Sequence, residues 1–344
     1  MKYYDIIKKN IEENSEVDWW PRFAYHYTNI TNAVSILEMG QIYSRSNAKV
    51  LGIMENDNAS RQVIDMTDSD AKNAARFYFR PLTPTQYYNE GYKHPQLRYD
   101  DDSNANCPVP VFFAFDLLKF LSIPGCSFSE TSRAGFAPTL YSGEEAFAQL
   151  NFQMIYKNGP MQDSAREKLY RQAELAQRSP MQIDTCLFAI LCRNEFEQSM
   201  LLTLLKEKDN KLFEKYRPFI KVNKKDMFER NGLYIENCIF HQNKLSILFS
   251  NNYNKIKYTQ RQKKDDLRLL NAKLEVDWYR QRSSRLERMH REFSTLEIDY
   301  EKPSPIFLLL PNIRNAKSLK IALYVENDLL GYKEFLLNEE NSVF

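Results

Sequence analysis

The sequence predicts a soluble protein that mixes α-helices with β-strands in one or two domains. Strand-like apolar runs alternate with helical stretches in the first part of the chain, and the composition changes after about residue 230. The 344 residues are 43% hydrophobic and 27% charged, which is ordinary for a globular protein with one large core or two smaller ones. We therefore expect an α+β domain over residues 1–229 and an accessory mixed α/β module over residues 230–344.

The clearest elements of the first part are apolar runs and one capped helix. VPVFFAFDLLKFL (109–121) begins as a Val- and Phe-rich strand and turns helical after Asp116. The run CLFAILCR (186–193) has the length of a central strand. Thr31 fits the N-cap of a helix that Gly40 closes, because Thr accepts backbone N–H groups and Gly adopts positive φ.

Two long polar stretches, 45–75 and 125–170, separate these elements and predict extended loops. Loops of this length in a compact domain are usually functional or disordered.

The second part is predicted to open with a helix and to continue as strands. Leu267, Leu270, Leu274 and Trp278 stand at i, i+3, i+7 and i+11, the stripe of an amphipathic helix within 261–293. This segment holds ten Lys/Arg and six Asp/Glu, a balance of +4, and its charges are interleaved as on a solvated face. Strand-like runs follow, and IFLLLP near residue 308 is predicted to be a buried strand.

Bulk properties argue against several classes of protein. The net charge is +2, so attraction to nucleic acid must come from a local patch. Five scattered cysteines without a C-x-x-C pair favour reduced thiols in a cytoplasmic protein over a disulfide framework. The four histidines lack metal-ligand spacing, so we expect no metal site. No apolar run has the length of a membrane span, and the charged first residues do not form a signal peptide.

Three short segments invite a chemical interpretation beside a structural one. The first is Tyr25-His26-Tyr27-Thr28-Asn29, where a histidine between tyrosines is more often a core residue than a ligand contact. In the second, residues 77–88, aromatic side chains surround Arg80 and two prolines; this is either a strand ended by a turn or the wall of a pocket for a flat ring. The third is Arg171-Gln172-Ala173-Glu174, which taken alone is the polar edge of a helix or loop.

Together and in this order, the three segments resemble the DarT group of ADP-ribosyltransferases. His26-x-Thr28 with Asn32 resembles the NAD-binding start of that family, Phe77-Tyr78-Phe79-x-Pro81 its aromatic strand, and Arg171-Gln172-Ala173-Glu174 the segment of its catalytic glutamate. The resemblance covers roughly residues 20–228 and implies an ADP-ribosyltransferase fold. In that fold a split central sheet, flanked by helices, holds NAD in a cleft without a metal.

The resemblance also implies a set of site residues. Glu174 would stabilise the positive charge that grows on the ribose as nicotinamide leaves. Arg61 is the candidate active-site arginine, with Arg45 as its competitor and a solvated surface arginine as the structural alternative; since guanidinium does not deprotonate, it would bind the diphosphate or orient the base. The remaining cofactor contacts implied by the motifs are His26, Tyr27, Thr28, Asn32, Phe77 and Tyr78.

The acceptor expected from the resemblance is a base in single-stranded DNA. Basic residues bracket the stretch before Glu174 and would supply a groove for the phosphate backbone, with Phe128, Phe136 and Tyr141 available for stacking. The candidate nucleic-acid contacts are Arg133, Lys157, Arg166 and Arg171.

Three functions remain open from the sequence. The first is a toxin that ADP-ribosylates single-stranded DNA, restrained by a cognate antitoxin in a toxin–antitoxin or phage-defence system. The second keeps the transfer from NAD and changes the acceptor to RNA or protein. The third is an inactive module that binds NAD or a partner. For residues 230–344, docking of the antitoxin or another partner is the working hypothesis.

Overall fold

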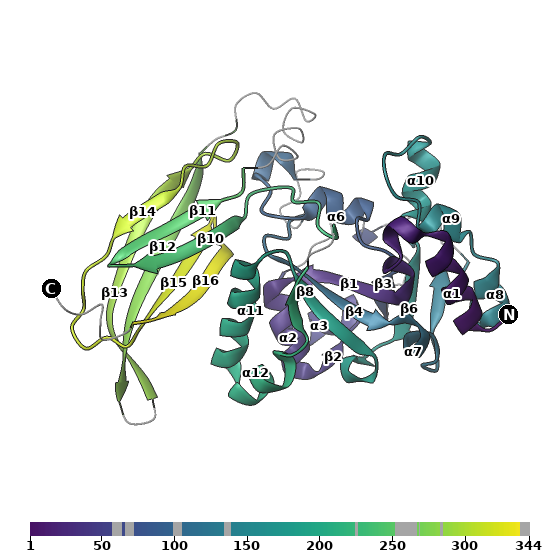
Figure 1. Cartoon of the computed structure of the whole chain (residues 1–344), viewed down its shortest axis with the longest axis horizontal. Helices are drawn as coiled ribbons and strands as arrows, with labels where there is room; N and C mark the ends of the chain where they lie inside the picture. Colours follow the sequence, from purple (N-terminus) through teal and green to yellow (C-terminus); the bar gives the residue numbers. More distant parts are fainter. Residues whose placement is uncertain are drawn as a thin grey trace.

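The protein forms two parts that lie side by side along its long axis (Figure 1), an α/β part and a β part. The computed structural model describes the following residues: 1–56, 64–65, 72–98, 105–133, 139–223, 226–251, 267, 269–282 and 285–337.

A seven-stranded mixed sheet forms the centre of the first part. In spatial order its strands are β5 (Ser127–Ser129), β6 (Glu174–Arg178), β3 (Ala74–Tyr78), β1 (Phe23–Asn29), β4 (Pro110–Asp116), β8 (Leu187–Cys192) and β9 (Ile220–Val222). Neighbouring strands are antiparallel except β8 and β9. This sheet and its helices confirm the expected mixed α/β domain.

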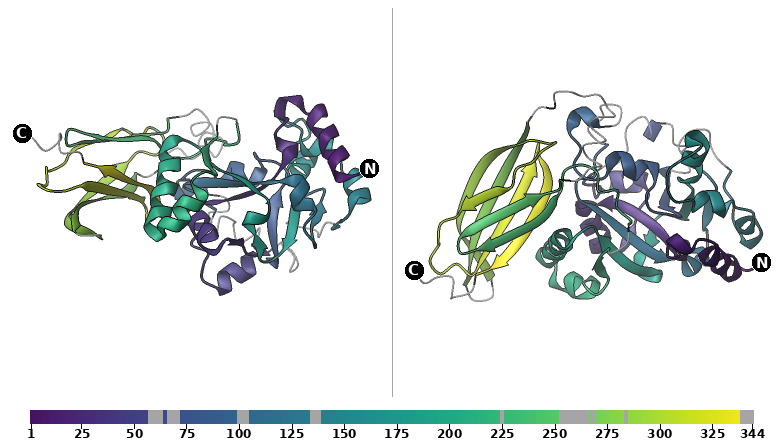
Figure 2. Two further views of the ribbon diagram at one scale, coloured as in Figure 1. Left: turned by 60° about the horizontal axis from the view of Figure 1, so that its bottom comes forward. Right: turned by 45° about the horizontal axis from the view of Figure 1, so that its top comes forward.

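Short helices surround this sheet (Figures 1 and 2). They are α1 (Tyr3–Glu13), α2 (Ile30–Met39), α3 (Arg45–Val50), α6 (Pro84–Asn89), α7 (Leu117–Leu121), α8 (Glu144–Ala148), α9 (Phe152–Ile155), α10 (Ser164–Tyr170), α11 (Glu195–Lys208) and α12 (Asn210–Tyr216). A two-stranded ribbon, β2 (Gln41–Ile42) with β7 (Met181–Gln182), lies beside them. None of the helices in the described part of the chain has the length and apolar character of a membrane span.

Strand β4 shows why the apolar run at 109–121 folds as predicted. Its residues are buried on both faces of the sheet: Phe113 and Phe115 enter the main core, while Phe112 and Ala114 enter a second, smaller cluster. At Asp116 the chain turns into α7, because the Asp116 carboxylate accepts the Lys119 N–H at 2.9 Å and caps the first turn.

The start of α2 differs from the expectation, whereas its end is confirmed. The N-cap position is Asn29 and not Thr31, because β1 runs directly into the helix without a loop. The Asn29 amide donates to the Thr31 hydroxyl at 2.9 Å. Gly40 ends the helix with φ 66°, the left-handed conformation that favours glycine.

The expected long loops contain more structure than the polar sequence predicted. Residues 45–50 form α3, and 125–170 contain β5, α8, α9 and α10. A buried carboxylate organises the last of these stretches: Glu167 accepts the Lys157 ammonium at 2.7 Å and the Gln162 and Asp163 N–H groups. The Lys157 hydrogen bond, opposed by burial, lowers the pKa of Glu167 to about 2.

The second part is a sandwich of two antiparallel sheets (Figure 2). One sheet contains β10 (Ile235–His241), β11 (Lys244–Phe249) and β14 (Ile306–Leu309). The other contains β13 (Arg285–Ile298), β12 (Leu270–Arg282), β15 (Ser318–Val325) and β16 (Asp328–Leu336). Within the described residues from Ile235 onward the chain forms strands and no helix, so the expectation of a mixed α/β module is wrong in its helical component.

The amphipathic helix expected within 261–293 is the clearest error. In its place β12 and β13 form a hairpin paired from Leu270↔Ile298 to Arg282↔Arg285, with one register shift between Trp278 and Tyr279. Leu270, Leu274 and Trp278 share a spacing of four, which fits the period of a strand as well as that of a helix. Ala272 and Val276 between them are buried too, which is the alternation of a strand.

The IFLLLP run forms a strand, as expected, but at the edge of its sheet. Phe307 is 68% exposed and Leu309 78% exposed, while Ile306 and Leu308 are half-buried, so the expectation of a buried strand is wrong.

Candidate active site

The central sheet is split between β1 and β3, and the split holds the site. Strand β1 pairs with β4 along its whole length, and β3 pairs with β6 along its whole length. Between β1 and β3 the register contains one pair, Tyr25↔Tyr78. Beyond it, the His26 side chain on β1 contacts the backbone of β3, with Nδ1 3.1 Å from the Arg76 carbonyl oxygen.

A pocket of about 220 Å³ lies at this split. Its walls come from β1, α2, α3, β3 and α6, and Glu174 at the start of β6 completes the lining. The three segments singled out in the sequence therefore meet at one cavity, although Glu174 is far along the chain from the other two.

Glu174 is a buried carboxylate in a strand, not the edge of a polar helix or loop. It is 1% exposed and lies directly opposite Tyr78 in the β3–β6 pairing. Arg76 binds it with two parallel hydrogen bonds, Nε to Oε2 and Nη2 to Oε1, each 2.6 Å long. The Arg133 N–H donates to Oε1 at 3.2 Å. A carboxylate held in this way is fixed in position next to the cavity.

The count of acceptor sites leaves room for a ligand. Each carboxylate oxygen offers about two lone pairs. Among the described residues Oε1 accepts two N–H groups, whereas Oε2 accepts one, from Arg76. Oε2 therefore retains a lone pair for a hydroxyl donor on a bound molecule.

Arg76 is the principal residue that the sequence analysis missed. It stands two positions before Tyr78 on β3, so both side chains project from the same face of the strand and both line the pocket. The sequence contained one sign of its role, an arginine inside an otherwise apolar strand. A charge in that position needs a partner of opposite charge on the same face of the sheet.

His26 lines the pocket as a neutral imidazole. Burial lowers its pKa below the ordinary value, and the contact with the Arg76 carbonyl opposes this effect. Because a carbonyl oxygen only accepts hydrogen bonds, Nδ1 carries the proton. Nε2 is then an acceptor for a hydroxyl group.

Asn32 lines the pocket and also shapes it. Its Oδ1 accepts the N–H groups of Glu55 and Asn56 at 2.9 and 3.0 Å, and its Nδ2 donates to the Asn56 carbonyl at 2.6 Å. The side chain thus fastens the segment after α3 to α2, which closes one side of the cavity. Tyr27 and Thr28 line the same cavity from β1.

The two aromatic residues of the second motif have different positions. Tyr78 lines the pocket, and burial raises the pKa of its hydroxyl, with the nearby Glu174 charge contributing in the same direction. Phe77 points to the opposite face of β3, where it packs against Phe115 and Phe120 in the main core. Alternation along a strand explains the difference, so Phe77 supports the sheet and is not part of the pocket lining.

Of the two candidate arginines, Arg45 lines the pocket from the start of α3. Arg61 lies outside the described residues, and so does Phe136.

The four candidate nucleic-acid contacts do not form one exposed surface. Arg133 is buried beside Glu174. Lys157 and Arg171 both pair with the buried Glu167, at 2.7 and 3.5 Å. Arg166 on α10 is exposed. Phe128 is buried, whereas Tyr141 stacks on it and is 40% exposed.

No cluster of potential metal ligands occurs among the described residues. The five cysteines are free thiols, four of them buried.

Comparison with known proteins gives a family and a set of similar folds. A family model described as "DarT: ssDNA thymidine ADP-ribosyltransferase" matches residues 25–228. Similar solved structures include DarT of Thermus sp. 2.9 in complex with NAD+, at 17% identity over 60% of this chain and 98% of that one, with a TM-score of 0.45. The same protein in complex with ADP-ribosylated ssDNA is 16% identical over 60% of this chain and 96% of that one, with a TM-score of 0.49. DarTG of Thermosipho africanus in complex with ADP-ribose is 15% identical over 64% of this chain and 53% of that one, with a TM-score of 0.46. No curated protein sequence matches the chain.

Proposed function

The chain belongs to the DarT family of NAD-dependent ssDNA ADP-ribosyltransferases, and we propose that it transfers ADP-ribose from NAD to a thymidine base with Glu174 as the catalytic carboxylate. One observation carries the assignment of the site: Glu174 is buried, clamped by Arg76 and adjacent to the pocket at the split of the sheet.

The reaction breaks the bond between the ribose C1′ and the nicotinamide nitrogen, and the bonding pair leaves with neutral nicotinamide. Positive charge grows on the ribose ring, and a nitrogen of the thymine base then bonds to C1′ and gives up its proton. A preorganised carboxylate stabilises this charge, because its position is fixed before the reaction starts. The free lone pair of Oε2 would accept a ribose hydroxyl and hold the sugar beside the charge.

The remaining pocket residues would hold NAD in a reactive geometry. Neutral His26 offers Nε2 to a ribose hydroxyl, and Thr28 and Tyr27 would anchor the nicotinamide end. Tyr78 supplies an aromatic wall, and Asn32 acts by closing the cavity through residues 55–56.

An arginine would compensate the negative charge of the NAD diphosphate. Arg61 remains the proposal from the sequence motif, and Arg45 is the candidate that the pocket lining supports. For contact with the DNA backbone, Arg166 is the best placed of the four candidates because it is exposed. Lys157 and Arg171 pair with Glu167, and Arg133 is buried.

The activity is tested by incubating the purified protein with NAD and single-stranded DNA oligonucleotides. We expect a mass gain of one ADP-ribose on thymidine-containing oligonucleotides and its loss in Glu174→Gln. Glu236→Gln, a change at an exposed glutamate on β10, is the matched control and should retain activity. Parallel reactions with RNA and with protein fractions cover the other acceptors. Modification by Glu174→Gln at the wild-type rate would contradict the assignment.

We also propose that the protein acts as a cytoplasmic toxin restrained by an antitoxin, in a toxin–antitoxin or phage-defence system. The reaction itself supports this, because modified bases block copying of DNA. Expression of the wild-type chain should arrest growth, and expression of Glu174→Gln should not.

A further inference from the structure

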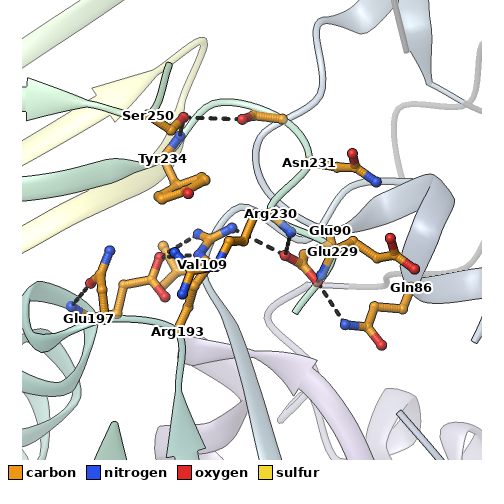
Figure 3. A network of polar contacts seen from close by, with 12 residues as sticks. Gln86, Glu90, Val109, Arg193, Glu197, Glu229, Arg230, Asn231, Tyr234 and Ser250 are labelled. Carbon is orange, nitrogen blue, oxygen red and sulfur yellow. Dashed lines mark hydrogen bonds and ion pairs between the residues drawn. The ribbon is translucent and has the colours of Figure 1, made fainter. Parts of the chain in front are cut away.

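A buried carboxylate at the junction of the two parts binds the chain that leads into the β-sandwich. Glu90 is 0% exposed and follows directly after α6. Its two oxygens accept the backbone N–H groups of Glu229 and Arg230, each at 2.8 Å (Figure 3). These residues lie a few positions before the start of β10 at Ile235, so Glu90 fixes the segment that leads into the second part.

The charge of Glu90 is compensated by a buried arginine of the first part. Arg193 lies 3.6 Å from Glu90 and also pairs with Glu197, and all three side chains are buried. The ring of Tyr234, just before β10, covers the guanidinium group at 3.7 Å from its centroid (Figure 3). The network therefore joins the first part to segment 227–234, which leads into the β-sandwich.

Two glycines allow the backbones to interlock at this junction. Tyr92 and Leu233 exchange two backbone hydrogen bonds of 2.9 and 2.8 Å. Gly91 and Gly232 have φ of 73° and 72°. A Cβ at Gly91 would lie 2.1 Å from the Asn231 carbonyl oxygen, so no other residue fits there.

The same network holds one wall of the pocket. Gln86 on α6 donates to Glu90 and to the Met227 carbonyl, both at 2.7 Å. The Asn231 amide donates to the Tyr87 carbonyl at 3.2 Å. Helix α6 also supplies Thr85 and Asn89 to the pocket lining. This wall is thus anchored from its far side by residues 227–231.

We infer that Glu90 is a positioning residue for the NAD site, and that segment 227–234, which leads into the β-sandwich, sets the affinity for NAD by completing the network that holds α6. The inference rests on the proposed function of the pocket. It gives this segment a direct role in the transferase, in addition to any docking of a partner by residues 230–344.

A second contact between the two parts provides a matched control. Glu207 on α11 accepts the Tyr332 hydroxyl of β16 at 2.7 Å and pairs with Lys320 of β15. Among the described residues Glu207 makes no hydrogen bond or ion pair with α6, and it does not line the pocket. Glu207→Gln therefore weakens the interface without touching the pocket wall.

The test compares Glu90→Gln, Gln86→Met and Glu207→Gln in the full chain. Equilibrium binding of NAD is measured by calorimetry, and KM for NAD and kcat are measured with a thymidine-containing oligonucleotide. A Gln at position 90 directs an N–H₂ group at one of the two backbone N–H donors, so one hydrogen bond of the network is lost and the anchoring of α6 is weakened. We therefore expect KM and Kd for NAD to rise roughly tenfold. Gln86→Met should raise both in the same direction, and Glu207→Gln should leave both unchanged.

The outcomes are distinguishable. A purely structural role for Glu90 would reduce the amount of active enzyme and leave KM and Kd for NAD at their wild-type values, which would overturn the inference. Equal shifts in Glu90→Gln and Glu207→Gln would overturn it as well, because the effect would then belong to the interface in general. Failure of the wild-type chain to bind NAD would instead contradict the proposed function.

Discussion

Replacing Arg76 by Ala tests the central feature of the site, the paired carboxylate. The Glu174 side chain is 2% exposed and that of Arg76 is 28% exposed, so the two partners have unequal access to water. Removing Arg76 leaves a buried charge with the Arg133 N–H as its remaining donor among the described residues. Removing the charge of Glu174 leaves Arg76 with access to water.

The expected magnitudes follow from this asymmetry. Two charge-assisted hydrogen bonds at the lower end of the usual range give Arg76→Ala a cost of about 3 kcal/mol in the free energy of unfolding. The Gln side chain keeps an acceptor for Arg133 and Arg76, so Glu174→Gln should cost about 1 kcal/mol. In the double variant the buried charge is absent, and we expect a coupling energy of about 2 kcal/mol between the two sites.

Urea denaturation of the wild type, both single variants and the double variant measures this coupling. Arg76→Lys should recover little of the loss, because an ammonium group cannot make two parallel hydrogen bonds to a carboxylate. The reasoning is refuted if the two changes are additive, or if Glu174→Gln destabilises the protein more than Arg76→Ala.

Two further predictions concern stability. The Lys157 hydrogen bond lowers the pKa of Glu167 from 4.5 to about 2, so its contribution is complete above pH 4.5 and is lost as the pH falls toward 2. Urea denaturation between pH 5 and pH 3 should show a shallower pH dependence in Glu167→Gln than in the wild type; identical slopes would contradict the ion pair. Trp278→Ala should destabilise the protein by about 3 to 5 kcal/mol, because the indole is buried between the two sheets. A change below about 1 kcal/mol in thermal denaturation would argue against the β12–β13 hairpin.

Local patterns predicted the elements whose period is unambiguous. The apolar run that forms β4, the change from strand to helix after Asp116 and the helix end at Gly40 each depend on neighbouring residues, and each was predicted correctly from the sequence. The stripe at Leu270, Leu274 and Trp278 fits two periods, and tertiary pairing with β13 decided between them.

The site was predicted only as far as its motifs extend. The order of the three segments assigned the chain to the correct family. The structure brings Glu174, His26 and Tyr78 to one pocket. The partner of Glu174 was not predicted, because Arg76 is 98 positions away and meets it through the pairing of β3 with β6. Phe77 was assigned to the pocket by its motif, although alternation along β3 sends it into the core.

The distance along the chain between Arg76 and Glu174 also has a consequence for synthesis. At roughly 5 to 20 residues per second, a ribosome needs about 5 to 20 s to travel the 98 positions between them. A nascent chain that has not yet reached β6 has most of the pocket wall but no carboxylate beside it. On the role proposed for Glu174, such a chain lacks the carboxylate that the transfer requires until β6 has inserted between β5 and β3. The proposed activity would therefore start well after the start of translation.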